Sequence, residues 1–136
     1  MGPLDHANRR TGILLAALLL GLLAGGCSGP NRPPLGKVAG TVTLDGQPLA
    51  EALVVFVPEQ AGRTSQAVTD ASGRYELVYL GDVGGAMVGK NAVRIITATA
   101  ENGGKERLPD RYHRASTLTA DVTSGENTFD FALTSK

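Results

Sequence analysis

From residue 37 onward, apolar side chains recur at every second position in short runs that turn signals separate. In the first run Val38, Val42 and Leu44 alternate with threonines, and the pair Asp45-Gly46 follows. Period-two alternation is typical of strands with one buried face, and an Asp-Gly pair favours a tight hairpin turn. The pattern predicts seven strands, near residues 37–44, 53–57, 64–69, 75–79, 91–99, 118–122 and 128–133, with a turn expected at 124–127.

No stretch after residue 36 has a helical period, so the sequence predicts an all-β fold. Seven antiparallel strands in about 100 residues are typical of a small β-sandwich, in which each of two sheets buries one face. Five of the six aromatic side chains fall at strand positions, and we expect these five in the core: Phe56, Tyr75, Tyr79, Phe129 and Phe131.

Two motifs in these strands resemble those of a known family. They are Gly40-Thr41-Val42 with the following Leu44-Asp45-Gly46-Gln47-Pro48-Leu49, and later Val68-Thr69-Asp70-Ala71-Ser72-Gly73-Arg74-Tyr75. Both resemble motifs of carboxypeptidase regulatory-like domains, and residues 108–131 resemble small lipoproteins of this family that are abundant in planctomycete-type bacteria. The resemblance covers nearly all of residues 37–133. It implies a transthyretin-like or Ig-like, seven-stranded antiparallel β-sandwich that acts as a structural or binding module, and it implies no catalytic residue.

The first 27 residues have the layout of an export signal. Arg9 and Arg10 precede an apolar run from Ile13 to Leu23, and small residues then lead to Cys27, the one cysteine of the chain. A basic segment, a short apolar segment and small residues define a secretory signal peptide, and the run is shorter than the roughly 20 residues of a membrane span. The segment before Cys27 resembles the lipobox of bacterial lipoproteins, which implies cleavage before Cys27 and acylation of its sulfur.

The sequence therefore predicts three parts. Residues 1–26 form a cleaved lipoprotein signal peptide, residues 27–36 form a lipidated cysteine with a proline-rich tether, and residues 37–136 form the sandwich. We expect an exported chain that is lipid-anchored on the extracytoplasmic side of a bacterial membrane. Loss of the leader lowers the basic side chains from 13 to 11 and the acidic ones from 13 to 12. Such balanced charge offers no electrostatic footprint for nucleic acid.

The expected mature chain has few groups for catalysis or metal binding. His113 is its one histidine, and no serine lies in a nucleophile-elbow pattern, so we expect a surface or packing histidine. A zinc site needs three or four His, Cys or acidic ligands. Residues 84–90 have the spacing of a phosphate-binding loop, but Asn91 replaces the Ser or Thr that would bind Mg²⁺. We therefore expect no enzyme, no metal and no cofactor, and a loop between strands at 84–90.

Two further patterns have simpler structural explanations. Asp70-Ala71-Ser72-Gly73 carries oxygens suited to calcium, but an Asx-type turn explains the same residues without further ligands. Lys37 and Asn127, on the first and last strands, are conceivable partners in an isopeptide bond, which would lower the mass by about 17 Da, one ammonia. We favour the turn over calcium and an unlinked pair over the crosslink.

The segment most open to a binding role is 100–116, because it is longer than the roughly two to five residues of a hairpin loop. We nevertheless favour a solvated loop that packs Leu108 and Tyr112 over the end of the sandwich. The candidate binding residues are Arg107, Arg111, Tyr112, His113 and Arg114.

These features together predict a membrane-anchored, non-enzymatic β-sandwich that acts as a binding or structural module of the bacterial cell envelope. Its expected partners are membrane lipid, through acylated Cys27, and an envelope protein or glycan. One alternative is a carrier or sensor of small ligands that uses loops 81–90 and 100–116, and another is an accessory subunit of an envelope hydrolase. A carrier predicts a concave apolar pocket, whereas a partner module predicts an exposed apolar patch.

Overall fold

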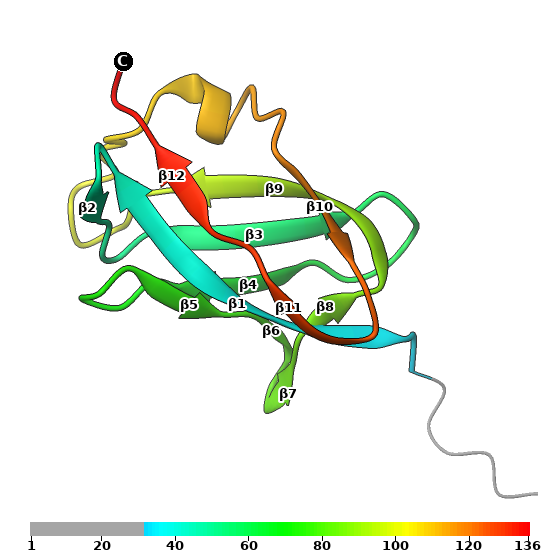
Figure 1. Cartoon of the computed structure of the whole chain (residues 1–136). Coiled ribbons are helices and arrows are strands. Elements are labelled where there is room, and N and C mark those ends of the chain that lie inside the picture. Colours follow the sequence, from blue (N-terminus) through cyan, green and yellow to red (C-terminus); the bar gives the residue numbers. More distant parts are fainter. Residues whose placement is uncertain (1–31) are drawn as a thin grey trace, which may run out of the picture. The chain divides into compact units, whose positions relative to one another are not determined.

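The computed structural model describes residues 32–136, which form a two-layered β-sandwich (Figure 1). The expected signal peptide and Cys27 lie outside the described residues, so cleavage and acylation stay predictions. One 3-10 turn is present in the described part, η2 (Asp110–Tyr112). The strands of the described part are β1 (Leu35–Leu44), β2 (Gln47–Pro48), β3 (Leu53–Pro58), β4 (Ser65–Val68), β5 (Arg74–Glu76), β6 (Val78–Leu80), β7 (Val83–Gly84), β8 (Ala86–Met87), β9 (Gly89–Ile96), β10 (Thr119–Val122), β11 (Gly125–Thr128) and β12 (Phe131–Leu133).

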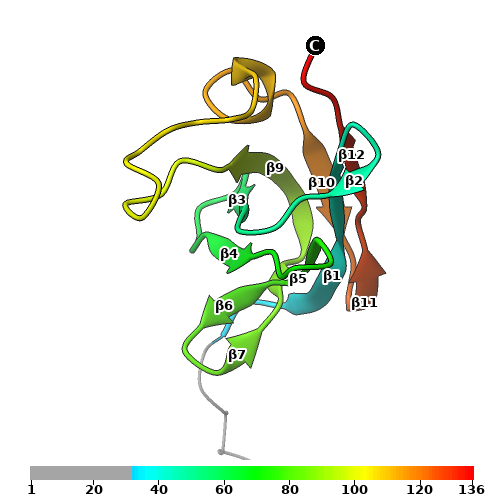
Figure 2. The ribbon, with the colours of Figure 1, turned by 90° about the vertical axis from the view of Figure 1, so that its left-hand side faces the viewer.

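These strands form two sheets. In the first sheet β2, β5, β8, β11 and β12 all pair with β1, and the second sheet has the order β10-β9-β3-β4-β6-β7. In the view of Figure 2, β1, β11 and β12 lie to one side of β3 and β4. β1 can pair with five strands because it is ten residues long, so different partners use different parts of it. The all-β sandwich predicted from the alternation is confirmed.

The last strands run parallel to β1, which refines the antiparallel arrangement expected from the sequence. β11 pairs through Lys37↔Glu126 and β12 through Thr43↔Ala132. The turn expected at 124–127 is shorter than predicted, because Gly125 takes a φ of 94° and already begins β11. A glycine adopts this left-handed conformation without the strain of a side chain, so the chain turns early and then follows β1.

The strand expected at 75–79 is divided between the two sheets. β5 pairs with β1 in the first sheet, whereas β6 pairs with β4 in the second. The chain crosses at Leu77, whose side chain is fully buried and whose N–H donates to the carbonyl of Val38 at 2.9 Å. Segments that switch sheets in this way form the corners of a sandwich.

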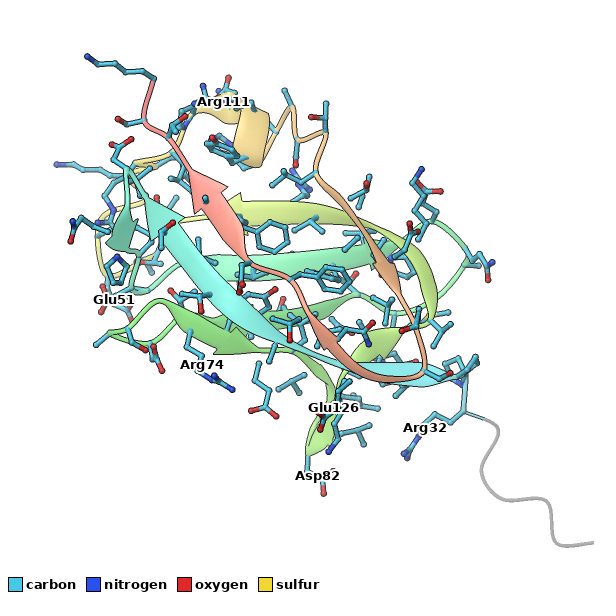
Figure 3. All side chains as sticks on the ribbon, in the orientation of Figure 1. Arg32, Glu51, Arg74, Asp82, Arg111 and Glu126 are labelled. Carbon is cyan, nitrogen blue, oxygen red and sulfur yellow. The ribbon has the colours of Figure 1, made fainter. Side chains whose placement is uncertain are left out.

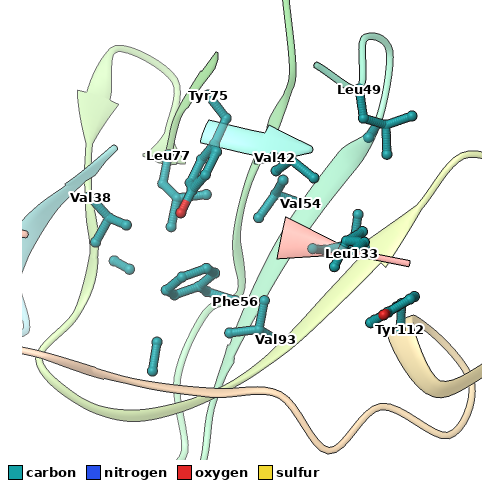
Figure 4. Close-up of a cluster of buried hydrophobic side chains, with 14 of the residues drawn as sticks. Val38, Val42, Leu49, Val54, Phe56, Tyr75, Leu77, Val93, Tyr112 and Leu133 are labelled. Atoms are coloured by element: carbon teal, nitrogen blue, oxygen red, sulfur yellow. The ribbon is translucent and has the colours of Figure 1, made fainter. Parts of the chain in front are cut away.

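Aromatic side chains join the two sheets in the core (Figure 4). Phe56 of β3 has its ring centroid 5.9 Å from that of Phe129 and 6.4 Å from that of Phe131, and Phe131 lies 6.3 Å from Tyr75. These separations are typical of favourable aromatic pairs. The aromatic core is therefore as predicted, with one exception. Tyr79 lies in β6 after the crossing, is half-buried, and lines a groove on the outside of the second sheet.

The core is closed at Gly40, where three segments meet. Gly40 is paired with Tyr75, and a Cβ at this glycine would lie 1.9 Å from the carbonyl oxygen of Phe129. The Tyr75 hydroxyl donates to that same oxygen at 2.5 Å, and burial raises the pKa of Tyr75. A side chain at residue 40 would therefore push the segment between β11 and β12 away from β1.

We expect Gly40→Ala to lower the free energy of unfolding by roughly 1–3 kcal/mol, because the new methyl group overlaps a backbone oxygen. Gly84→Ala is the matched control, since its Cβ would lie 3.6 Å from the nearest atom, an ordinary contact. This control should change stability by less than about 0.5 kcal/mol. Urea denaturation followed by circular dichroism measures both, and equal losses in the two variants would contradict the close approach at Gly40.

Candidate functional site

The long segment 97–118 covers one end of the sandwich (Figure 1). Some of the candidate binding residues in this segment are buried in the sandwich core. Leu108 and Tyr112 are buried in the core, as the packing alternative predicts. His113 is also buried, with Nε2 at 3.0 Å from the carbonyl oxygen of Leu108. It is thus a packing histidine, and the rings of Tyr112 and His113 do not present a stacking surface to solvent.

The arginines of this segment are exposed, but two of them are held by neighbouring groups. Arg111 donates from Nη2 to the carbonyl and the hydroxyl of Thr134, both at 2.8 Å, and lies over the ring of Tyr112. Arg114 forms a two-pronged contact with Asp110 at 2.9 Å, which holds the pKa of that carboxyl below its usual value. The five candidate residues therefore do not form one open cluster. A binding role for segment 100–116 stays a prediction.

Glu106 organises this segment, and the sequence reasoning missed it. Its carboxylate accepts hydrogen bonds from the N–H groups of Thr97 at 3.0 Å, Ala98 at 3.2 Å and Leu108 at 3.1 Å, and from the Thr97 hydroxyl. Burial raises the pKa of Glu106, but the bonds from the Thr97 side chain and the three backbone groups outweigh it and lower the pKa overall. No local motif marks this role, because Thr97 lies nine residues away.

The turn predicted at Asp70 is confirmed. One oxygen of Asp70 accepts from the N–H groups of Ser72 and Arg74, both at 2.9 Å, and from the Ser72 hydroxyl at 2.7 Å. The Ser72 hydroxyl contributes most to lowering the pKa of this carboxyl. This is the side-chain-to-backbone pattern of an Asx turn.

The glycine-rich residues 84–90 contain strand pieces where a loop was expected. They run from the end of β7 through β8 into β9, so a strand follows them, as the sequence context indicated. β8 pairs with the start of β1 through Gly36↔Ala86, and this pairing orders the segment. Nearby, the Asn127 amide donates to the main-chain carbonyls of Lys37 at 3.0 Å and Thr123 at 2.8 Å.

The segments 81–90 and 100–116 lie at opposite ends of the sandwich. Asp82 and Arg111 mark these two ends in Figure 3, and the eight-residue β9 runs between the segments. An extended strand of this length spans roughly 26 Å. Neither of the two hollows described below, both within residues 32–136, is lined by residues of both loops, and the carrier alternative stays an expectation.

The outer face of the second sheet carries more aliphatic side chains than that of the first. Positions of β1, β5 and β11 that alternate with buried ones carry mostly polar or charged groups: Lys37, Thr41, Thr43, Arg74, Glu76, Glu126 and Thr128. On the second sheet Leu53 is adjacent to the apolar Val68 and Ile96, whereas Val55 lies between the exposed Gln66 and Arg94. We call the apolar part of this surface the aliphatic face, and it consists of Leu53, Val55, Val68, Val78, Leu80 and Ile96.

Three members of the aliphatic face are strongly exposed: Val68 at 61%, Val78 at 42% and Leu80 at 52%. They surround a groove of about 560 Å³ between β4 and β6, where Arg63 contributes the one charged side chain of the lining. A smaller hollow of about 270 Å³ lies on the first sheet, and its lining includes Lys37, Arg74, Glu76 and Glu126. The hollow on the second sheet thus has one charged side chain, and the hollow on the first sheet has four.

In residues 32–136, no helix is long and apolar enough to cross a bilayer. The same range contains no group of three or more His, Cys, Asp or Glu side chains placed to hold a metal ion.

Comparisons with known proteins identify no family for this chain. No family model matches it, and no curated protein matches it. A DUF3823 family protein from Parabacteroides merdae ATCC 43184 aligns with 74% of this chain and 46% of its own length, at 14% identity and a TM-score of 0.46. A 9R-lipoxygenase from Cyanothece PCC8801 aligns with 79% of this chain and 18% of its own length, at 18% identity and a TM-score of 0.38. This chain therefore spans less than half of either protein.

We expect Glu106→Gln to lower the free energy of unfolding at pH 7 by roughly 1–3 kcal/mol, because hydrogen bonds to a charged acceptor are replaced by weaker ones. A lowered folded-state pKa stabilises the fold above the ordinary glutamate value of about 4.3, and this contribution is lost as pH falls through the folded-state pKa. Wild type and variant should therefore converge in acid.

Urea denaturation at pH 7 and at successively lower pH measures this difference. Glu101→Gln is the matched control, since Glu101 is an exposed carboxylate of the same segment. A stability difference that persisted unchanged in acid, or an equal loss in the control, would rule out the ionised Glu106 carboxylate as the organising group.

Proposed function

We propose that this chain is a lipid-anchored, non-enzymatic binding module of a bacterial cell envelope, built on a carboxypeptidase regulatory-like sandwich. The aliphatic face is the observation that carries the proposal. A solvated sheet face is normally polar, as it is in the first sheet, and contiguous apolar surface marks interaction sites. An exposed apolar patch of this kind is what we expect of a module that binds a partner.

The chemistry of the face favours a protein as the partner. Its members are branched aliphatic side chains, and the half-buried Tyr79 is the one aromatic ring that lines its groove. A glycan would find hydrogen-bond partners at Arg63, Thr64 and Gln66, but its hydroxyl groups over the aliphatic side chains would have none, which is costly when water is excluded. A small ligand would remain mostly uncovered on an open sheet face, whereas ligand sites bury most of their ligand. A protein surface with apolar side chains avoids both costs.

The expected tether determines which end of the domain would face the membrane. β1 begins at Leu35 beside Met87 of β8, at the end of the sandwich opposite η2 (Figure 1). An acylated Cys27 would therefore hold the domain by this end, and segment 97–118 would point away from the membrane. The aliphatic face lies along the side of the sandwich between the two ends, within reach of a neighbouring envelope protein.

The anchor is tested by the intact mass of the protein from membrane fractions, beside Cys27→Ala. We expect the wild type to be heavier than residues 27–136 by a diacylglyceryl group, since the cysteine sulfur is the acylation site. The variant should lose this mass and keep its leader. A wild-type chain of residues 27–136 in the soluble fraction without added mass would exclude the tether.

The face is tested with a photoreactive residue at position 55 of the second sheet and, as the matched control, at position 41 of the first sheet. We expect a discrete crosslinked protein from position 55 and none from position 41 in intact cells. Adding Ile96→Lys should abolish the product, because a charge would be buried in the contact. Urea midpoints of both chains verify folding.

Three results would contradict the proposed face. They are crosslinking of similar yield from both positions, no product from position 55, and a product that survives Ile96→Lys. A product of twice the mass of this chain would instead identify a second copy, and it too would contradict a separate protein partner.

A further inference from the structure

The groove between β4 and β6 results from incomplete strand pairing. β4 pairs with β3 along four residues, from Leu53↔Val68 to Phe56↔Ser65. On its other side it pairs with β6 at one position, Gln66↔Val78. The ladder between β6 and β7 is irregular between Val78 and Leu80. The groove therefore lies over a short and irregular part of the sheet, on its outer face.

Side chains around the groove form a channel that combines aliphatic residues with the polar Thr64 and Gln66 and one charge. Val68, Val78 and Leu80 line it and are the large apolar side chains that are most exposed in the described residues. Arg63 stands just before β4 and is exposed, and its guanidinium has no carboxylate partner among residues 32–136. The lining contains no acidic side chain. The channel therefore offers an occupant aliphatic contacts, hydrogen-bonding side chains and one cation.

We propose that this groove binds an extended segment of the partner protein, which carries aliphatic side chains at alternate positions and a carboxylate that pairs with Arg63. The inference rests on the proposed function and names the part of the partner that the groove would take. An extended segment that lies over the groove presents alternate side chains to it, and pockets for these side chains supply specificity. Side chains two positions apart point to the same face of a strand and lie roughly 7 Å apart, so they can reach successive apolar residues of the channel.

Charge decides among the possible occupants. A second copy docked about a twofold axis would bring Arg63 towards the partner copy's own Arg63 with no carboxylate in the lining, which is unfavourable. An anionic membrane surface is typically recognised by clusters of about four to eight basic residues, and this groove has one. An acidic group on a separate polypeptide can pair with Arg63, while apolar side chains of the same polypeptide contact the aliphatic lining.

The test is selection of random heptapeptides, displayed on phage, against the purified full-length chain. We expect enriched peptides to have Val, Ile or Leu at alternate positions with Asp or Glu at one end. Selection on Arg63→Glu should exchange the acidic preference for Lys or Arg. A synthetic copy of one enriched peptide should bind at least about tenfold more weakly when its acid becomes an amide.

Matched variants separate the groove from the rest of the aliphatic face. Val78→Lys and Val68→Lys should each abolish peptide binding, whereas Ile96→Lys, outside the lining, should retain it. All three side chains are at least partly exposed, and unchanged urea midpoints will show that the variants fold.

Other results would overturn the inference. These are no alternating aliphatic pattern, a pattern that Arg63→Glu leaves unchanged, or binding that survives both groove variants. Sedimentation that shows a dimer dissociated by Val78→Lys would assign the groove to a second copy. If crosslinking at position 55 depends on Ile96 but no peptide is selected, the proposed function stands and the groove inference fails. If neither is observed, both fail.

Discussion

The contact of Gly40 with the Phe129 carbonyl is the constraint on which the first sheet depends. The Tyr75 hydroxyl donates to this oxygen, the Phe129 N–H donates to Ala39, and the Thr41 N–H donates to the Asp130 side chain. A buried carbonyl without a donor would cost about 1–3 kcal/mol. Because all of these groups are paired at the point where β11 passes into β12, the C-terminal segment can follow β1 along its whole length and close the core.

The path of the chain after Tyr75 produces the groove between β4 and β6. Tyr75 holds β5 in the first sheet, and the next core residue, Leu77, takes the chain across to the second sheet. β6 therefore arrives beside β4 as a short strand with one paired position, instead of continuing a regular ladder. Val78 and Leu80 are left exposed by this crossing. The groove thus depends on the closure of the core at Gly40, although no residue of that contact lines it.

Local sequence signals predicted those features that local chemistry determines. The Asp45-Gly46 pair has φ values of 51° and 83°, as a hairpin turn with two left-handed residues requires, and Asp70 forms the expected Asx turn. Alternation placed the long strands correctly. The parallel return of β11, the division of residues 75–79 at Leu77 and the role of Glu106 were not predictable in this way, because each is determined by contacts between segments that are distant along the chain.

The candidate site shows the same limit of prediction from local sequence. Tyr112 and His113 are residue types common in binding loops, and the sequence allowed both a binding and a packing role for them, of which the structure shows packing. The apolar positions of β3 and β9 predict strands, but alternation alone cannot tell whether the outer face of these strands is covered. An uninterrupted apolar run such as Leu53–Val57 is typical of a strand that is buried on both faces. In this sandwich one of those faces is only half-buried within residues 32–136, because no further layer of the described chain packs on it.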